Sequence, residues 1–416
     1  MKTEILLRWF FLGQLMLVSI TQAQWVQTNL NADVGHALYS DGTIIYAATA
    51  LGVYYTSDIG DPWFSIGPAN EDIYCIIKTG NKIIAGSGTS HGVFLTTDNG
   101  QNWYQPPTLT NQTVYALAKN SSYVFAGTWG GGIFRSGDNG ESWESAGLAG
   151  KGFKALLAVG DTLFAASPES NSIVYFTGDN GNTWDYGSLG YPTGDLRCLF
   201  YNEGKLFACD MGLWVSIDMG STWHIQYGLE FDSTGYPINV KLFRSITKYN
   251  QYLIGSVFTE SIYFSSDNGV SWTPFNEGTI SDWTFEDLGI NGSYLWALRD
   301  FFGNAYRRPV QELLTGLEEK LNHISDFRLG QNYPNPFNPT TTITFELPNS
   351  SDVSLVIYNL TGRLIKILTS SRYPAGSHQI QWDGRDTQGN MVASGIYVYR
   401  MNAGTYSQSH KMMLLK

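Results

Sequence analysis

Two short patterns in this chain have the spelling of catalytic motifs. Gly88-Thr89-Ser90-His91-Gly92 fits the GxSxG of hydrolases, in which a nucleophilic serine stands on a sharp turn between a strand and a helix. No helical pattern follows Gly92, so we interpret this segment as a loop between two strands. Residues 147–152, GLAGKG, lack the glycine spacing and the Ser or Thr after lysine that a phosphate-binding loop needs. We interpret them as a turn between repeats.

Residue types that bind metal ions show no ligand spacing in this sequence. The six histidines form neither HExxH nor any paired pattern. Asp383, Asp386 and Asn390 could face one cation, but their DG and GN steps are more simply typical of turns. We therefore predict no metal ion and no cofactor.

The three cysteines are too few for a disulfide framework and include no CxxC pair. Cys75 is expected to be a buried thiol. Cys198 and Cys209 flank a short NEGK loop, which would place their side chains opposite each other in a hairpin. Both a cross-strand disulfide and two packed thiols remain open, since a bridge demands strict geometry.

The composition favours turn-rich β structure. The 416 residues include 45 glycines, 25 tyrosines, 22 phenylalanines and 13 tryptophans, whereas charged residues make up 15%. This length is sufficient for two or three domains. The formal net charge of −11 would repel a phosphate backbone, so no nucleic-acid partner is expected.

The N-terminal residues predict export. Lys2 and Arg8 supply a positive start, residues 9–20 are mostly apolar, and Thr21-Gln22-Ala23 offers a small-residue cleavage site. We therefore predict a signal peptide over 1–23. No later stretch approaches the roughly 20 apolar residues of a transmembrane helix, so we expect a monomeric mature chain without a transmembrane segment.

A motif of the form S/T-x-D-x-G-x-x-W occurs six times in the chain. Its aspartates are separated by intervals of 40, 40, 41, 39 and 49 residues, a period typical of four-stranded propeller blades. We predict that Asp and Asn cap turn amides, Gly supplies positive φ and Trp packs between blades. The motif residues with this structural role are Asp58, Asp98, Asp138, Asp179, Asp218, Asp267, Trp63, Trp103, Trp143, Trp184, Trp223 and Trp272.

These motifs resemble the Asp-box (bacterial neuraminidase, BNR) repeat of sialidases, sortilin-type receptors, xyloglucanases and photosystem assembly factors. The resemblance covers residues 24–308 and implies a β-propeller. After the sixth motif, WTFEDLGIN, YLWALRD and NAYRRPV predict three strands without a fourth. The segment from Gln24 to Leu30 resembles a strand that follows a motif, with Trp25 in place of the motif tryptophan. We therefore predict seven blades, the last closed by the N-terminal strand, which removes exposed strand edges.

The same resemblance implies one enzymatic alternative, a sialidase-like or other glycoside hydrolase. Sialidases clamp an acid carboxylate with three arginines, and Arg197, Arg244 and Arg299 could approach the channel mouth. Against this alternative, the FRIP-type segment of sialidases is absent, sialidases have six blades, and no nucleophile with a partner base is evident. We expect a protein that binds rather than catalyses.

In a propeller, the loops that join the second and third strands of the blades gather on one face. Here these loops carry aromatic side chains beside charged ones, a combination that suits recognition of an extracellular glycan or protein. The candidate binding residues on or beside these loops are His91, Trp129, Glu169, Asp210, Met211, Glu260, Arg299, Asp300, Phe301 and Phe302.

The C-terminal part of the chain predicts a second domain. Residues 309–326 lose the glycine and aromatic density and are interpreted as a linker, whereas 327–416 contain short alternating runs typical of a small Ig-like β-sandwich. Its motifs are NYPNPFNPTT, YNLTGR, GSHQIQWDGRDTQGN, SGIYVYR and KMMLLK. They resemble the type A C-terminal sorting domain of the type IX secretion system, which is related to flagellar hook-cap Ig-like domains.

This second resemblance implies that an outer-membrane type IX translocon recognises the domain after passage into the periplasm. It assigns the sorting signal to Gly395, Tyr397, Lys411 and Lys416. The expected location is therefore the cell surface, attached to the outer membrane, or the extracellular medium.

Overall fold

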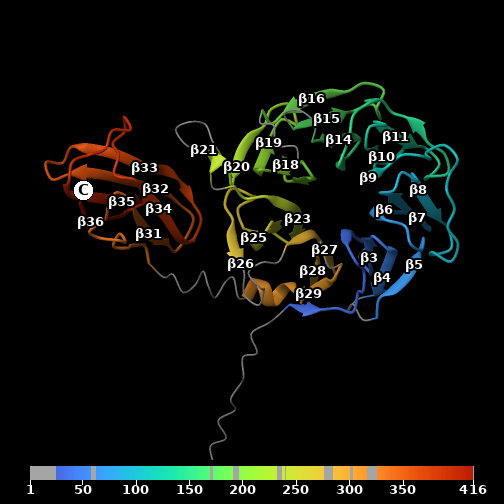
Figure 1. Cartoon of the computed structure of the whole chain (residues 1–416), viewed down its shortest axis with the longest axis horizontal. Helices are drawn as coiled ribbons and strands as arrows, with labels where there is room; N and C mark the ends of the chain where they lie inside the picture. The colour runs from blue at the N-terminus through green and yellow to red at the C-terminus, as the bar shows by residue number, and fades with distance from the viewer. Residues whose placement is uncertain are drawn as a thin grey trace, which may run out of the picture.

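The structure is a computed structural model that describes residues 25–57, 62–168, 172–190, 196–231, 237–238, 240–275, 284–299, 303–315 and 326–415. Seven small antiparallel sheets form a ring, and a separate β-sandwich follows them (Figure 1). The predicted all-β fold, a seven-bladed propeller followed by an Ig-like sandwich, is confirmed.

The first three blades follow one another along the chain. Blade 1 contains β2 (Gly35–Ser40), β3 (Ile44–Thr49), β4 (Gly52–Ser57) and β5 (Phe64–Gly67). Blade 2 contains β6 (Ile73–Thr79), β7 (Lys82–Ser87) and β8 (Val93–Thr96), and a bridge from Leu95 to Tyr104 continues it outward. Blade 3 contains β9 (Val114–Lys119), β10 (Val124–Thr128), β11 (Ile133–Ser136) and β12 (Glu144–Ser145).

The next three blades repeat this meander. Blade 4 contains β13 (Ala155–Val159), β14 (Thr162–Ser167), β15 (Ile173–Thr177) and β16 (Asp185–Ser188). Blade 5 contains β17 (Cys198–Asn202), β18 (Lys205–Asp210), β19 (Gly212–Ser216) and β20 (His224–Tyr227). A small hairpin of β21 (Glu230–Phe231) and β22 (Pro237–Ile238) precedes blade 6, which contains β23 (Phe243–Tyr249), β24 (Tyr252–Val257), β25 (Ser261–Ser265) and β26 (Thr273–Phe275).

The seventh blade joins the two ends of the propeller. Its strands are β27 (Phe285–Asn291), β28 (Tyr294–Arg299), β29 (Ala305–Pro309) and, outermost, β1 (Val26–Gln27). Val26 lies opposite Arg307 and Gln27 opposite Tyr306 in antiparallel register. Trp25 is 7% exposed and its ring centroid lies 5.4 Å from that of Phe285. The predicted closure by the N-terminal strand is therefore confirmed.

The second strand of each blade is almost entirely buried, as in KIIAGS of β7 and TLFAAS of β14. Such strands are near-continuous apolar runs because both of their faces pack against neighbouring blades. A carboxylate strengthens this packing where the ring closes. Asp287 Oδ2 accepts a hydrogen bond from the Leu38 amide of blade 1 at 2.8 Å, and Asp287 Oδ1 accepts one from Ser245 Oγ of blade 6 at 2.6 Å.

Five of the six S/T-x-D-x-G-x-x-W motifs lie fully within the described residues and share one turn geometry, shown here for blade 4. Asp179 Oδ1 accepts hydrogen bonds from Thr177 Oγ1 at 2.7 Å and from the Thr183 amide at 2.9 Å, and Thr183 Oγ1 donates to Asp179 Oδ2 at 2.7 Å. These bonds from Thr183 and Thr177 lower the pKa of Asp179 to about 2. The same contacts recur at Asp98, Asp138, Asp218 and Asp267, whereas Asp58 lies outside the described residues.

The six motif tryptophans use their indole N–H groups in two ways. Trp143, Trp223 and Trp272 donate to the glycine carbonyl of their own box at 3.0 to 3.2 Å. The others reach outside their own box, to Thr28 Oγ1 from Trp63, to the Ile66 carbonyl from Trp103 and to the Ala146 carbonyl from Trp184.

The segment after β29 is partly helical and belongs to the propeller core. Residues 310–315 are helical, and Val310, Leu313 and Leu314 are buried in the same cluster as Trp25 and Phe285. The beginning of the predicted linker therefore packs against the closing blade. Among the described residues, no helix is long and apolar enough to cross a membrane.

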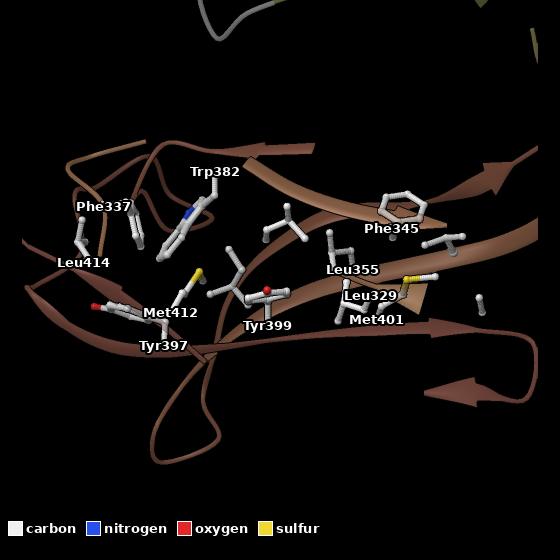
Figure 2. Close-up of a cluster of buried hydrophobic side chains, with 14 of the residues drawn as sticks. Leu329, Phe337, Phe345, Leu355, Trp382, Tyr397, Tyr399, Met401, Met412 and Leu414 are labelled. Carbon is white, nitrogen blue, oxygen red and sulfur yellow. The ribbon is translucent and has the colours of Figure 1, made fainter. Parts of the chain in front are cut away.

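The C-terminal domain consists of two facing sheets. One contains β30 (Arg328–Leu329), β31 (Thr341–Leu347) and β34 (Gly376–Trp382), and the other contains β33 (Leu364–Tyr373), β32 (Ser351–Asn359), β35 (Gly395–Ala403) and β36 (Tyr406–Leu414). Figure 2 shows the apolar side chains between them, including Trp382, Phe345 and Tyr399. The NYPNPF segment closes one end, since Phe337 exchanges backbone hydrogen bonds with Met413 and Leu415 at 2.9 Å.

Candidate ligand site at the channel mouth

A cavity of about 610 Å³ lies at the centre of the ring. Every blade contributes three consecutive residues to its lining, from the innermost strand or the residue directly before it. These triplets begin at His36, Tyr74, Tyr115, Lys154, Arg197, Arg244 and Glu286. We call these seven first residues the mouth ring.

A backbone irregularity sets the mouth ring apart from the rest of each strand. In blade 6, Phe243 pairs with Val257 and Ser245 pairs with Ser256, which leaves Arg244 as the extra residue of a β-bulge. The same skip in register occurs at the mouth-ring positions of blades 1, 2, 3 and 7. Bulges redirect a side chain relative to the regular alternation of a strand and are common beside functional sites.

Blades 4 and 5 reach the same arrangement directly before their first strands. The Lys154 amide donates to the carbonyl of Ala166, the residue that also pairs with Ala155. The Arg197 amide donates to the carbonyl of Cys209, which also pairs with Cys198. All seven blades therefore place one side chain at the same level of the cavity.

Below the mouth ring the cavity becomes apolar. Two residues further along each innermost strand, roughly 6 to 7 Å deeper, the lining consists of Leu38, Ile76, Leu117, Leu156, Leu199, Ile246 and Leu288. A ligand that enters the cavity would meet polar and aromatic groups first and an aliphatic floor beyond them.

Aromatic rings occupy one side of the mouth. The ring centroids of His36 and Tyr74 are 4.2 Å apart, those of Tyr74 and Tyr115 are 4.8 Å apart, and those of Tyr115 and Trp129 are 5.7 Å apart. Trp129 comes from the loop between β10 and β11 and is 49% exposed. Asp72 Oδ1 lies 2.7 Å from His36 Nε2 at the end of this row. Burial raises the pKa of Tyr74 above its usual value.

Cationic side chains occupy the other side, on three consecutive blades. The Lys154 ammonium lies 6.0 Å from the Trp129 ring centroid, so the cationic and aromatic sides meet there. Arg197 Nη1 forms an ion pair of 2.8 Å with Glu286 Oε1, and Arg244 lies between these two residues in blade order. The Arg244 guanidinium carbon is 4.7 Å from the ring centroid of Phe258.

Asp287 and Cys198, each directly after a mouth-ring residue, also line the cavity. Burial raises the pKa of Asp287 to about 6, although hydrogen bonds from Leu38, Ser245 and Leu288 oppose this shift. Cys198 and Cys209 lie directly opposite each other in β17 and β18, as predicted from the NEGK hairpin, and both are free thiols. Burial raises the pKa of Cys209 well above its usual value.

The predicted loop residues are only partly brought together. Trp129 reaches the mouth, whereas His91 lies 2.9 Å from Glu71 Oε2 and Glu260 pairs with Lys241 at 2.6 Å. Asp210 is buried and accepts a hydrogen bond from Ser172 Oγ at 2.6 Å, so its carboxylate serves the fold. Met211 takes part in the packing of blade 5. Glu169, Asp300, Phe301 and Phe302 lie outside the described residues.

Two of the three arginines considered for a carboxylate clamp line the cavity. Arg197 and Arg244 belong to the mouth ring, whereas Arg299 ends β28 opposite Phe285 and is absent from the cavity lining that the structure describes. Lys154 supplies a third cation instead. Ser90 lies in the loop between β7 and β8 with Oγ 3.1 Å from Thr113 Oγ1. Over the described ranges, no group of three or more His, Cys, Asp and Glu residues could hold a metal ion.

Five members of the mouth ring were not predicted from the sequence: His36, Tyr74, Tyr115, Lys154 and Glu286. A signal for them exists when the blades are aligned on their innermost strands. Each blade has a buried residue or glycine, then the mouth-ring residue, then a small residue or aspartate, then Leu or Ile, as in Phe243-Arg244-Ser245-Ile246. In this alignment the mouth-ring position varies among polar and aromatic residues, whereas the positions around it vary less in residue type. This difference marks the site.

Three of the residues predicted to form a sorting signal lie on the last two strands of the sandwich. Tyr397 is buried and donates a hydrogen bond to the Ala393 carbonyl at 2.7 Å, whereas Gly395 and Lys411 are exposed. Lys416 lies outside the described residues.

Comparisons with known proteins give different matches for the two domains. Residues 331–407 match the FlgD Ig-like domain family. No curated protein sequence matches the chain. The chain is similar in structure to PorZ, a bacterial surface component of the type IX secretion system of Porphyromonas gingivalis, with 15% identity and a TM-score of 0.51. This match covers 93% of the present chain and 60% of PorZ.

Two further structures support the propeller. The extracellular domain of BT4673 from B. thetaiotaomicron has 11% identity and a TM-score of 0.53, over 94% of this chain and 59% of that one. YCF48 from Cyanidioschyzon merolae has 14% identity and a TM-score of 0.54, over 70% of this chain and 100% of that one. The present chain therefore spans about 60% of the length of PorZ and BT4673. At these identities the similarity shows a shared fold.

Proposed function

We propose that this protein is an exported binding module that recognises an extracellular glycan or protein at the channel mouth. One observation carries the proposal. All seven blades place a polar or aromatic side chain at one level of a cavity of about 610 Å³, at five of them through a β-bulge. A concave site with convergent polar groups over an apolar floor is the usual form of a ligand site.

The binding test uses the mature chain on arrays of glycans and peptides. Tyr115→Ala removes the centre of the aromatic row, so ligands held at the mouth should lose about tenfold in affinity, which corresponds to about 1.4 kcal/mol. Tyr104→Ala is the matched control, because Tyr104 is an exposed tyrosine on the outer side of blade 2. Ligand affinities that Tyr115→Ala leaves unchanged would refute the proposal. The absence of binding to any member of either array would also refute it.

We also propose that the protein does not catalyse glycoside hydrolysis. Arg197 is engaged by Glu286, and the described lining offers two arginines rather than three. The test is a hydrolysis screen of the purified chain against sialosides and β-glucans. Turnover that disappears in Arg197→Ala or Arg244→Ala would overturn this part of the proposal.

The C-terminal sandwich is proposed to be a sorting domain for a type IX outer-membrane translocon, with the cell surface or medium as destination. The FlgD Ig-like match and the PorZ similarity support this assignment. Deletion of residues 395–416 removes β35 and β36 and should trap the chain in the periplasm, but it also removes six of the fifteen buried residues of the sandwich core. Lys411→Glu tests the signal itself, since Lys411 is exposed; unchanged surface display of both variants would refute the assignment.

A further inference from the structure

We propose that the mouth ring binds an acidic oligosaccharide, with a sugar carboxylate against Lys154 and Arg244 and sugar faces against the aromatic row. This inference rests on the proposed binding function and specifies its ligand. Lys154, Arg197 and Arg244 form one cationic side of the mouth, and carboxylates bind such groups through charge-assisted hydrogen bonds. The partly enclosed cavity strengthens these bonds relative to a flat surface.

The aromatic side favours a sugar over a simple anion. His36, Tyr74, Tyr115 and Trp129 form a continuous row in which neighbouring ring centroids lie 4.2 to 5.7 Å apart. The C–H groups on one face of a pyranose pack on aromatic rings while its hydroxyl groups remain free for hydrogen bonds. Because Lys154 lies 6.0 Å from the Trp129 ring, a sugar on Trp129 would bring a ring carboxylate within reach of that ammonium.

Glu286 distinguishes a polyhydroxylated ligand from an acidic peptide. Its Oε1 accepts from Arg197, and its buried Oε2 has no hydrogen-bond partner among the described residues. A sugar hydroxyl can donate to this oxygen, which offsets the cost of leaving a buried acceptor unpaired. Polyglutamate has no side-chain hydroxyl group that could donate to this oxygen. The site therefore offers cations for one acid group, an acceptor for a hydroxyl group and aromatic faces for the rings.

The test measures binding of the mature chain by calorimetry to a panel of carboxylated oligosaccharides. The panel contains oligogalacturonate, oligoalginate, hyaluronan oligomers and sialyllactose, each beside its methyl ester, with hexaglutamate as the acidic peptide. At least one acid should bind, and its ester should bind at least about tenfold more weakly, because esterification removes the charge-assisted hydrogen bonds. Binding of the acid should also weaken as salt is added.

Matched variants localise the effect. Lys154→Gln and Arg244→Gln should each weaken the acid at least about tenfold and leave the ester unchanged. Lys248→Gln is the control, because Lys248 lies on the same strand as Arg244, four residues beyond the mouth; it should change affinity by less than about twofold. Glu286→Gln should weaken the ester, because the amide nitrogen that replaces Oε2 cannot accept a hydrogen bond from a sugar hydroxyl.

Each other result overturns the inference. An ester that binds as tightly as its acid would show that the site does not recognise the carboxylate. Equal losses of affinity in Lys248→Gln and Arg244→Gln would show that the ligand does not bind at the mouth ring. If hexaglutamate binds at the mouth and none of the oligosaccharides does, the ligand is not a sugar. These three results leave the proposed binding function intact if Tyr115→Ala still weakens array binding about tenfold. No binding to any member of the panel refutes the inference, and the arrays then decide separately whether the mouth binds another ligand.

Discussion

Ring closure depends on Trp25, and its truncation should destabilise the whole propeller. The side chain is 7% exposed, contacts Phe285 and lies in one buried cluster with Tyr306 and Val310. Truncation of a buried tryptophan to alanine costs about 3 to 5 kcal/mol, a large share of the roughly 5 to 15 kcal/mol that stabilises a typical domain. β1 contributes only two residues to its sheet, so it has little else to hold it in place.

Two further variants sharpen this prediction. Trp25→Phe retains a ring against Phe285, and it loses no hydrogen bond because the buried Trp25 Nε1 has no partner in the part of the chain that the structure describes. It should cost less than about 1.5 kcal/mol. Val26→Ala, at an exposed neighbour in the same strand, should cost about 0.5 kcal/mol or less. Urea unfolding followed by circular dichroism measures all three. A cost below about 1 kcal/mol for Trp25→Ala, or equal costs for Ala and Phe, would refute this account of closure.

Three other predictions concern stability and reactivity. Asp218→Ala removes the acceptor for Ser216 Oγ and the Thr222 amide and should cost about 1 to 2 kcal/mol, measured by urea unfolding; an unchanged midpoint would contradict the structural role of the box. Burial raises the pKa of Asp287 to about 6 from 3.8, so the native state binds more protons than the unfolded state between these values, and this group's contribution to stability falls as pH rises from about 4 to 6. Asp287→Asn should remove this dependence of the urea midpoint on pH. A dependence that Asp287→Asn leaves unaltered would refute the assignment to Asp287. In the native chain, alkylation followed by mass spectrometry should modify Cys198 before Cys209, because burial raises the pKa of Cys209; equal rates would contradict the described burial.

The arrangement of the blades could be predicted because the repeats are local and regular. Each Asp-box fixes one turn through bonds within about six residues, as Asp179 does with Thr177 and Thr183, so the period of the motif gives the period of the blades. Closure followed from Trp25, whose place relative to the following strand matched the motif tryptophans. The strands of the sandwich followed from their alternating pattern, which matches residues facing its core such as Phe345 and Tyr399.

The candidate site was largely missed because it depends on a backbone irregularity. Missed mouth-ring residues such as Tyr74 and Tyr115 lie at bulges, where the alternation of inward and outward residues fails. Regular alternation along the strand therefore does not predict that their side chains point into the cavity. Conversely, Asp210 was predicted to bind a ligand from its loop, but it is buried and accepts a hydrogen bond from Ser172 of the neighbouring blade. A contact between two blades decided the outcome for Asp210, and the pairing of two strands within a blade decided it for the mouth ring.

The most direct test of the account is a crystal structure of the mature chain with the strongest ligand from the arrays. We predict electron density for the ligand inside the mouth ring, with a ring on Tyr115 or Trp129 and an acid group beside Lys154 or Arg244. Density for the ligand on the outer strands of a blade or on the C-terminal sandwich, with no ligand in the central cavity, would contradict the account.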